Sequence, residues 1–268
     1  MKTLRVFDHV PESISFAIWA TAFLQGRETL ERAVDSMSDS PRVIETGVEK
    51  EHLSIYLSRI RRDNFSGIRC HFPIEGNTDS IIGIDEFVDI SLRLGHCLTS
   101  ISKNPKGIIL SENTWIEVDR KKSPAPLKNS WQDFDKSLSD SLHEISEELE
   151  AFDLIKHNNE ARNLLIDLDH DISIQQFPDD QNSRITFLIG RLLRVLAITQ
   201  FALEENIQTF SASKNQLIST PILELNQICR SGLSTVVNYG IENLSSHKSE
   251  EHTSELQSRF GISYAVFC

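Results

Sequence analysis

Residues 130–152 read SWQDFDKSLSDSLHEISEELEAF, the most regular amphipathic pattern in the chain. Ser130 followed by Asp133 resembles a capping box at the start of a helix. The apolar side chains then recur at steps of three and four residues: Trp131, Phe134, Leu138, Leu142, Ile145, Leu149 and Phe152. Glutamates occupy other sides of this helix. The stretch therefore predicts a long helix that buries one apolar stripe.

Apolar steps of three and four residues recur on both sides of this stretch. They predict further helices over residues 11–36, 49–62, 87–101, 160–176, 183–210 and 221–241. Residues 64–83 contain three glycines and a proline with little periodicity, which predicts a loop. Residues 108–118 leave two interpretations open, a short strand and an extended link.

Together these patterns predict an all-α fold in which long antiparallel amphipathic helices form a bundle or a helical rod. We expect a mostly helical N-terminal region over residues 1–118, interrupted by the loop at 64–83. Residues 119–129 contain lysines and prolines and predict a linker. Residues 130–247 are then the helical bundle region.

The last twenty residues differ in character from the rest. Residues 249–268 read SEEHTSELQSRFGISYAVFC and resemble the translation of a common short-read sequencing adapter. Residues 249–258 match its first constant part and residues 262–268 match its second, with the variable index falling between them. We interpret 249–268 as a non-native, adapter-derived tail and exclude it from the fold prediction. We therefore expect the native chain to be a fragment of a larger helical protein.

The composition narrows the class of protein. The 268 residues carry 39 acidic and 27 basic side chains, for a formal charge of −12. This acidic balance argues against nucleic acid as a partner. No apolar run reaches the roughly 18–20 residues that a membrane span needs. Outside the tail, Cys70, Cys97 and Cys229 are widely spaced, which is typical of reduced thiols in a cytoplasmic protein.

One segment resembles a catalytic motif. Residues 164–171 read LLIDLDHD, similar to the opening motif of haloacid-dehalogenase-type phosphatases. That resemblance implies Asp167 as the nucleophile and Asp169 as the acid/base, with magnesium bridging to phosphate. Asp171 stands where the motif usually has Thr or Val, and the residues that follow predict helices rather than strands. We therefore favour carboxylates on a solvated helix face and keep a metal-dependent phosphoester hydrolase as the alternative.

Cysteine and histidine occur as two adjacent pairs, Cys70-His71 and His96-Cys97. Four such side chains could in principle bind zinc. Structural zinc sites, however, usually take their ligands from positions two to four residues apart on tight turns. A small buried thiol is also ordinary on the apolar stripe of a helix, where Cys97 is predicted. We assign no catalytic, cofactor-binding or metal-binding residue and expect no cofactor.

The order of features over residues 87–247 resembles the first subunit of the conserved oligomeric Golgi complex. A Trp-led amphipathic helix is followed by the segment Phe187–Leu193 (FLIGRLL) and by a helix containing Leu225–Leu233 (LNQICRSGL). Val236 and Val237 stand where that family has a Trp. The resemblance implies a helical-rod subunit of a vesicle tether, without catalysis, held peripherally on Golgi membranes through its partners.

The sequence thus predicts a non-enzymatic scaffold or tether subunit, because it offers apolar stripes to bury and few groups to react. The expected partners are other helical protein subunits, and the expected location is the cytoplasm, with peripheral attachment to the Golgi membrane. Two alternatives stay open. One is the hydrolase that uses Asp167 and Asp169, and the other is a kinetochore or cytoskeletal helical adaptor, which composition does not separate from a tether.

Overall fold

The structure, a computed structural model, contains a six-stranded sheet as well as helices, so the all-α prediction is wrong. It describes residues 10–37, 40–47, 49–74, 81, 85–120, 131–136, 138–140, 177–209 and 220–242. The strands are β1 (Val43–Glu45), β2 (Lys50–His52), β3 (Gly67–His71), β4 (Cys97–Ile101), β5 (Lys106–Ser111) and β6 (Thr114–Asp119). The helices are α1 (Val10–Leu24), α2 (Leu30–Ser36), α3 (Leu53–Arg62), α4 (Asp85–Leu94) and α7 (Ser183–Thr209), with a further helix over residues 220–242.

The sheet is mixed. Its strand order is β2-β1-β6-β5-β4-β3, in which β1 runs parallel to β6 and every other neighbouring pair is antiparallel. The β5–β6 hairpin pairs Leu110 with Trp115, and Glu112 in its turn has a φ of 55°. The short strand β2 and the strand β3 form the two edges of the sheet.

Two segments explain why the sequence did not predict the sheet. The loop predicted over 64–83 contains β3, and the helix predicted over 87–101 ends at Leu94 and continues as β4. Gly95 makes that change of direction, because its φ of 71° is easily reached only without a side chain. All five residues of β3 are buried, as are the first four of β4. Strands covered on both faces lack the apolar–polar alternation that identifies a strand in a sequence.

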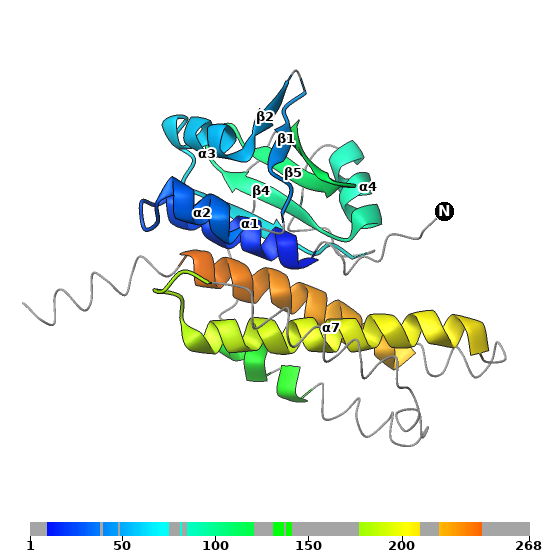
Figure 1. Cartoon of the computed structure of the whole chain (residues 1–268). Coiled ribbons are helices and arrows are strands. Elements are labelled where there is room, and N and C mark those ends of the chain that lie inside the picture. The colour runs from blue at the N-terminus through cyan, green and yellow to red at the C-terminus, as the bar shows by residue number, and fades with distance from the viewer. Residues whose placement is uncertain are drawn as a thin grey trace, which may run out of the picture.

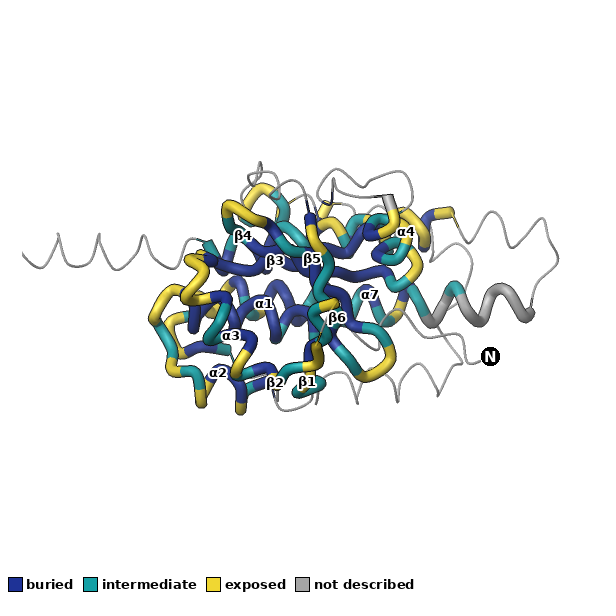
Figure 2. Tube along the Cα trace, turned by 90° about the horizontal axis from the view of Figure 1, so that it is seen from above, coloured by how far each residue is buried: buried dark blue, intermediate teal, exposed yellow. Residues whose placement is uncertain are grey.

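Helices α1 and α3 cover one face of the sheet, and α4 covers part of the other (Figure 1). On the first face, the Phe16 ring of α1 lies 4.7 Å from the Trp115 ring of β6, centroid to centroid. On the second face, the ring of Phe87 packs directly on Gly107 of β5. In Figure 2 the central strands and α1 are largely buried, whereas exposed residues gather on α2 and at the ends of the strands.

We call residues 10–120 the α/β unit, and residues 131–140, 177–209 and 220–242 the helical unit. The helix predicted from Ser183 is present as α7, and the helix predicted from Pro221 is present over residues 220–242. The 220–242 helix, orange in Figure 1, lies between α7 and the α/β unit. Apolar side chains of both units form one continuous core, which binds the two parts together.

Candidate functional site

The sequence-predicted catalytic carboxylates, Asp167 and Asp169, lie outside the described residues, as does Asp171. The adapter-like tail at 249–268 and most of the predicted linker at 119–129 lie outside them as well. The described residues therefore provide a site only from the α/β unit and from the described parts of the helical unit.

The two cysteine–histidine pairs meet at the ends of β3 and β4, where His71 is paired with Cys97 and Cys70 with Leu98. Successive side chains of a strand point to opposite faces, so each adjacent pair is split between the two sides of the sheet. His71 Nε2 hydrogen-bonds with Thr99 Oγ1 at 2.7 Å, on the same face as Cys97. Within the described ranges, no three side chains of His, Cys, Asp or Glu come together as metal ligands.

Burial sets the protonation of these groups. It raises the pKa of Cys97 and of Cys229 to about 12, and it also raises the pKa of Cys70. Burial, helped by the positive charges of Arg120 and Arg69, lowers the pKa of His71 to about 3. Near neutral pH the thiols are therefore protonated and this imidazole is uncharged. Thiols in this state are poor nucleophiles, and their environment is that of structural cysteines.

A network of charged side chains joins α3 to strands β2, β5 and β6. Arg59 Nη2 lies 2.7 Å from Glu51 Oε1 and 3.8 Å from Glu117 Oε2. Lys106 Nζ lies 3.3 Å from Glu117 Oε1. The pKa of the fully buried Tyr56 is raised, first by burial and then by the neighbouring Glu117 carboxylate. These groups neutralise one another, which indicates a structural role.

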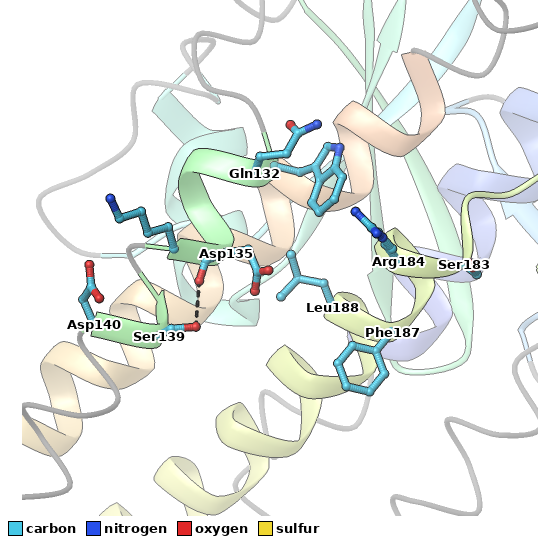
Figure 3. A pocket seen from close by; sticks show the side chains of 10 residues that line it. Gln132, Asp135, Ser139, Asp140, Ser183, Arg184, Phe187 and Leu188 are labelled. Carbon is cyan, nitrogen blue, oxygen red and sulfur yellow. Dashed lines mark hydrogen bonds between the residues drawn. The ribbon is translucent and has the colours of Figure 1, made fainter.

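The helical unit carries an open groove of about 620 Å³ between residues 131–140 and the first turns of α7 (Figure 3). Ten residues line it: Trp131, Gln132, Asp135, Lys136, Ser139, Asp140, Ser183, Arg184, Phe187 and Leu188. Leu188 is buried, whereas Phe187 leaves 68% of its surface exposed. We call this surface the Phe187 groove. It combines an apolar floor, an exposed aromatic ring and charged rims.

The two walls of the Phe187 groove are held by specific contacts. Arg191 Nη1 lies 3.5 Å from Asp135 Oδ1 and 3.4 Å from Ser139 Oγ, which joins α7 to the opposite wall. Ser139 Oγ also donates to the Asp135 carbonyl at 3.0 Å. The ring of Phe134 presses against Gly232 so closely that a Cβ there would lie 2.0 Å from it. The 131–140 segment is thus fixed to both long helices.

The sequence identified part of this surface. Trp131, Phe134 and Leu138 are partly or fully buried, as their predicted stripe requires. Phe187 was included in a predicted helix, but it stands next to the buried side of α7 rather than on it. An apolar residue beside a regular stripe is the signal that could have identified it. The charged rims were missed because the groove joins segments about fifty residues apart, as in the Asp135–Arg191 pair.

Fold and groove define a two-part protein, in which an α/β unit and a helical unit share a core and the helical unit carries an open groove. The chain belongs to the Rv1486c-like proteins. Residues 13–114 match the family described as Rv1486c-like protein, N-terminal domain, and residues 132–234 match the corresponding C-terminal domain. Neither the curated proteins nor the solved structures give a match.

This family overturns the resemblance to a Golgi-complex subunit, on which the interpretation as a vesicle tether rested. The physical reason is that the quoted segments, FLIGRLL and LNQICRSGL, are amphipathic helix patterns that many helices share. The same patterns serve here to bury α7 and the 220–242 helix against each other and against a sheet. Among the described residues, no helix has both the length and the apolar character that crossing a bilayer requires.

Proposed function

We propose that the chain is a non-catalytic protein-binding module, and that the Phe187 groove receives an amphipathic helix of a partner protein. The observation that carries this proposal is the 68% exposure of the Phe187 ring at the mouth of a groove with an apolar floor. Large aromatic side chains are normally buried, and an exposed one beside an apolar pocket is typical of an anchor for protein recognition.

The shape of the groove favours a helical partner. Its walls are α7 on one side and residues 131–140 on the other (Figure 3), so a third helix can lie along the open side of the groove that they form. Such a helix would place apolar side chains against Phe187, Leu188 and Trp131 at steps of three and four residues. Two of these three residues already belong to a packed surface, so little ordering is needed on this side of the interface.

The charges favour a partner with acidic residues. Arg184 and Lys136 lie on opposite walls of the groove, and in the described parts of the chain neither forms an ion pair. Asp135, in contrast, is paired with Arg191. Carboxylates flanking the apolar anchors of the partner could therefore meet Arg184 and Lys136 without displacing an existing pair.

The titratable groups of the α/β unit support a non-catalytic role. His71 hydrogen-bonds to Thr99 and stays uncharged at neutral pH, and Cys97 is fully buried. General acid/base catalysis needs a group that titrates near the working pH and reaches the substrate. These residues instead hold neighbouring elements together.

Site-specific photocrosslinking tests the proposal. A photoreactive phenylalanine analogue replaces Phe187 in the full chain, and a matched chain carries it at Ile55, which is 59% exposed on α3. Both chains are irradiated in extract of the source organism, and the crosslinked segments are sequenced by mass spectrometry. We expect position 187, and not position 55, to capture one protein through an acidic amphipathic segment.

A synthetic peptide of the captured segment then provides the quantitative test. We expect it to become helical on binding, and we expect Phe187→Ala to weaken binding about tenfold or more, as for an anchor residue. Arg184→Glu should also weaken binding, and this loss should grow as the salt concentration is lowered. Ile55→Ala should leave binding unchanged. Equal capture at both positions, or a captured peptide indifferent to Phe187→Ala, contradicts the proposal.

A further inference from the structure

The helical unit has the layout of an antiparallel four-helix bundle of which the described residues supply three helices. They are α7, the 220–242 helix and the helical turns at 131–136 and 138–140. In such a bundle each helix touches two neighbours on sides about a quarter turn apart, and neighbouring helices run in opposite directions. The three helices therefore define where a fourth helix would lie and which way it would run.

The 220–242 helix is antiparallel to α7. Near the start of α7, Ile185 faces Gly240, where an added Cβ would lie 3.0 Å from the Ile185 side chain. Further along, Thr199 Oγ1 accepts a hydrogen bond from Asn226 Nδ2 at 3.0 Å. Residue numbers thus rise along α7 while they fall along the 220–242 helix, as they do in neighbouring helices of an antiparallel bundle.

The 131–140 segment supplies the third helix. Its Phe134 ring packs on Gly232 of the 220–242 helix. Figure 3 shows Gln132 toward the Arg184 end of the Phe187 groove and Asp140 toward the opposite end, so this segment runs in the same direction as α7. In a bundle of alternating directions, two helices that run the same way occupy opposite corners. The 131–140 segment and α7 therefore take opposite corners, with the 220–242 helix at the corner between them.

The two sides of α7 mark the places of its two neighbours. Ile185 and Thr199 are buried on the side that faces the 220–242 helix, whereas Arg184, Phe187 and Leu188 line the groove. Successive residues of an α-helix are about 100° apart, so these two sides are separated by roughly a quarter turn. The groove is thus the side on which the second neighbour of α7 belongs, and no helix among the described residues lies there.

The charged side chains differ between the two ends of the groove. Arg184 lies at the end where α7 begins and Asp140 at the other end, and in the described parts of the chain neither forms an ion pair. Asp135 and Arg191 already pair with each other at 3.5 Å. A helix carries partial negative charge at its C-terminus and partial positive charge at its N-terminus. A helix antiparallel to α7 therefore meets opposite charge at both ends of the groove.

We propose that the Phe187 groove is the open fourth position of an antiparallel four-helix bundle, and that the partner's helix fills it antiparallel to α7. The C-terminal turn of that helix then lies beside Arg184 and its N-terminal turn beside Asp140. The inference rests on the proposed function, because it gives the direction of the helix bound in the groove. It selects partners whose amphipathic helix carries acidic side chains in its last turn.

Photocrosslinking at both ends of the groove tests the direction. The photoreactive phenylalanine analogue replaces Gln132, toward Arg184, in one full chain and Ser139, beside Asp140, in another. Seven helical residues separate these positions, a rise of about 10 Å. After capture in the extract, mass spectrometry locates each crosslink within the partner segment. We expect position 132 to react near the C-terminus of that segment and position 139 to react about seven residues closer to its N-terminus.

Peptides of the captured segment add a test that depends on charge. One peptide ends in a free carboxylate and its twin in an amide, and both end at the residue that the crosslinks set beside Arg184. We expect the free carboxylate to tighten binding about two- to fivefold, as one favourable exposed charge contact does. Arg184→Gln should abolish this difference, whereas Arg62→Gln, at an exposed position of α3, should preserve it.

The outcomes separate this inference from the proposed function. Crosslinks that follow the same order along both chains would mean a helix parallel to α7, which overturns the inference and leaves the proposed function standing. Twin peptides that bind equally would do the same. Crosslinks to residues of the same chain would mean that the chain fills its own groove, which overturns both. Both also fail if positions 132, 139 and 187 capture no protein.

Discussion

The two long helices of the helical unit differ in the side chains that they bury and expose. The 220–242 helix brings polar side chains to buried backbone groups and satisfies them, as Asn238 does for Cys70. Helix α7 leaves the ring of Phe187 in solvent beside an apolar floor. A buried polar group with its partner stabilises the fold, and an exposed apolar group without cover is available for binding. From this contrast we propose a structural role for the first surface and partner recognition for the second.

A large effect is expected at the β3 edge, which the 220–242 helix covers. Asn238→Leu leaves the N–H and C=O of Cys70 buried without partners, which should lower the free energy of unfolding by about 2–4 kcal/mol. Urea denaturation of the monomer at low concentration measures this change. Asn226→Leu, where a partly buried amide loses a single hydroxyl contact, should cost about 1 kcal/mol. Equal costs at the two positions would mean that Asn238 is an ordinary helix residue.

Two glycines, one in each unit, pack closely against an aromatic ring and differ in how freely that ring can move. A Cβ on Gly107 would lie 2.3 Å from the ring of Phe87, which is fully buried and has nowhere to move. Gly107→Ala should therefore destabilise the chain by about 1–3 kcal/mol, as overpacking of a core does. Gly232→Ala meets the half-buried Phe134, which can swing outward. We expect a smaller loss of thermal stability there, together with weaker binding at the Phe187 groove.

The sequence predicted the helices of the helical unit better than the strands of the α/β unit. Helical spacing correctly placed α7 and the 220–242 helix, because each buries one continuous stripe. The same spacing wrongly predicted a helix in place of β4, because Leu94, Cys97, Leu98 and Ile101 also fall at steps of three and four residues. Those side chains in fact divide between the end of α4 and a strand covered on both sides. Only the tertiary structure distinguishes the two arrangements.

The sites were harder to predict than the helices. The Phe187 groove depends on residues 131–140 meeting α7, and the β3 edge depends on Asn238 meeting a strand 168 residues earlier. One readable signal was present. Ser234 and Asn238 are polar residues one turn apart next to Leu233 and Val237, so a buried helix face carries hydrogen-bonding groups. Such groups require partners, although the sequence does not say which.

Acid should weaken the sheet through His71. Its pKa of about 3 in the folded protein lies below the roughly 6.5 of an unfolded histidine, so the unfolded chain binds the proton first. Stability is therefore lost as the pH falls from about 6.5 toward 3, by up to about 1.4 kcal/mol per pH unit. Urea titrations at several pH values measure the slope. His71→Gln should flatten it, and His52→Gln, at an exposed position, should not. An unchanged slope in His71→Gln would remove His71 as its cause.

The smallest effect on stability is expected at Phe187, and its smallness is the informative result. A ring that is 68% exposed contributes little to the core, so Phe187→Ala should change the free energy of unfolding by no more than about 0.5 kcal/mol. Leu188→Ala, one residue away and 2% exposed, should cost about 2–5 kcal/mol. If Phe187→Ala proved as costly as Leu188→Ala, the ring would belong to the core. A near-neutral effect on folding combined with a large loss of partner binding would separate recognition from structure at adjacent residues of α7.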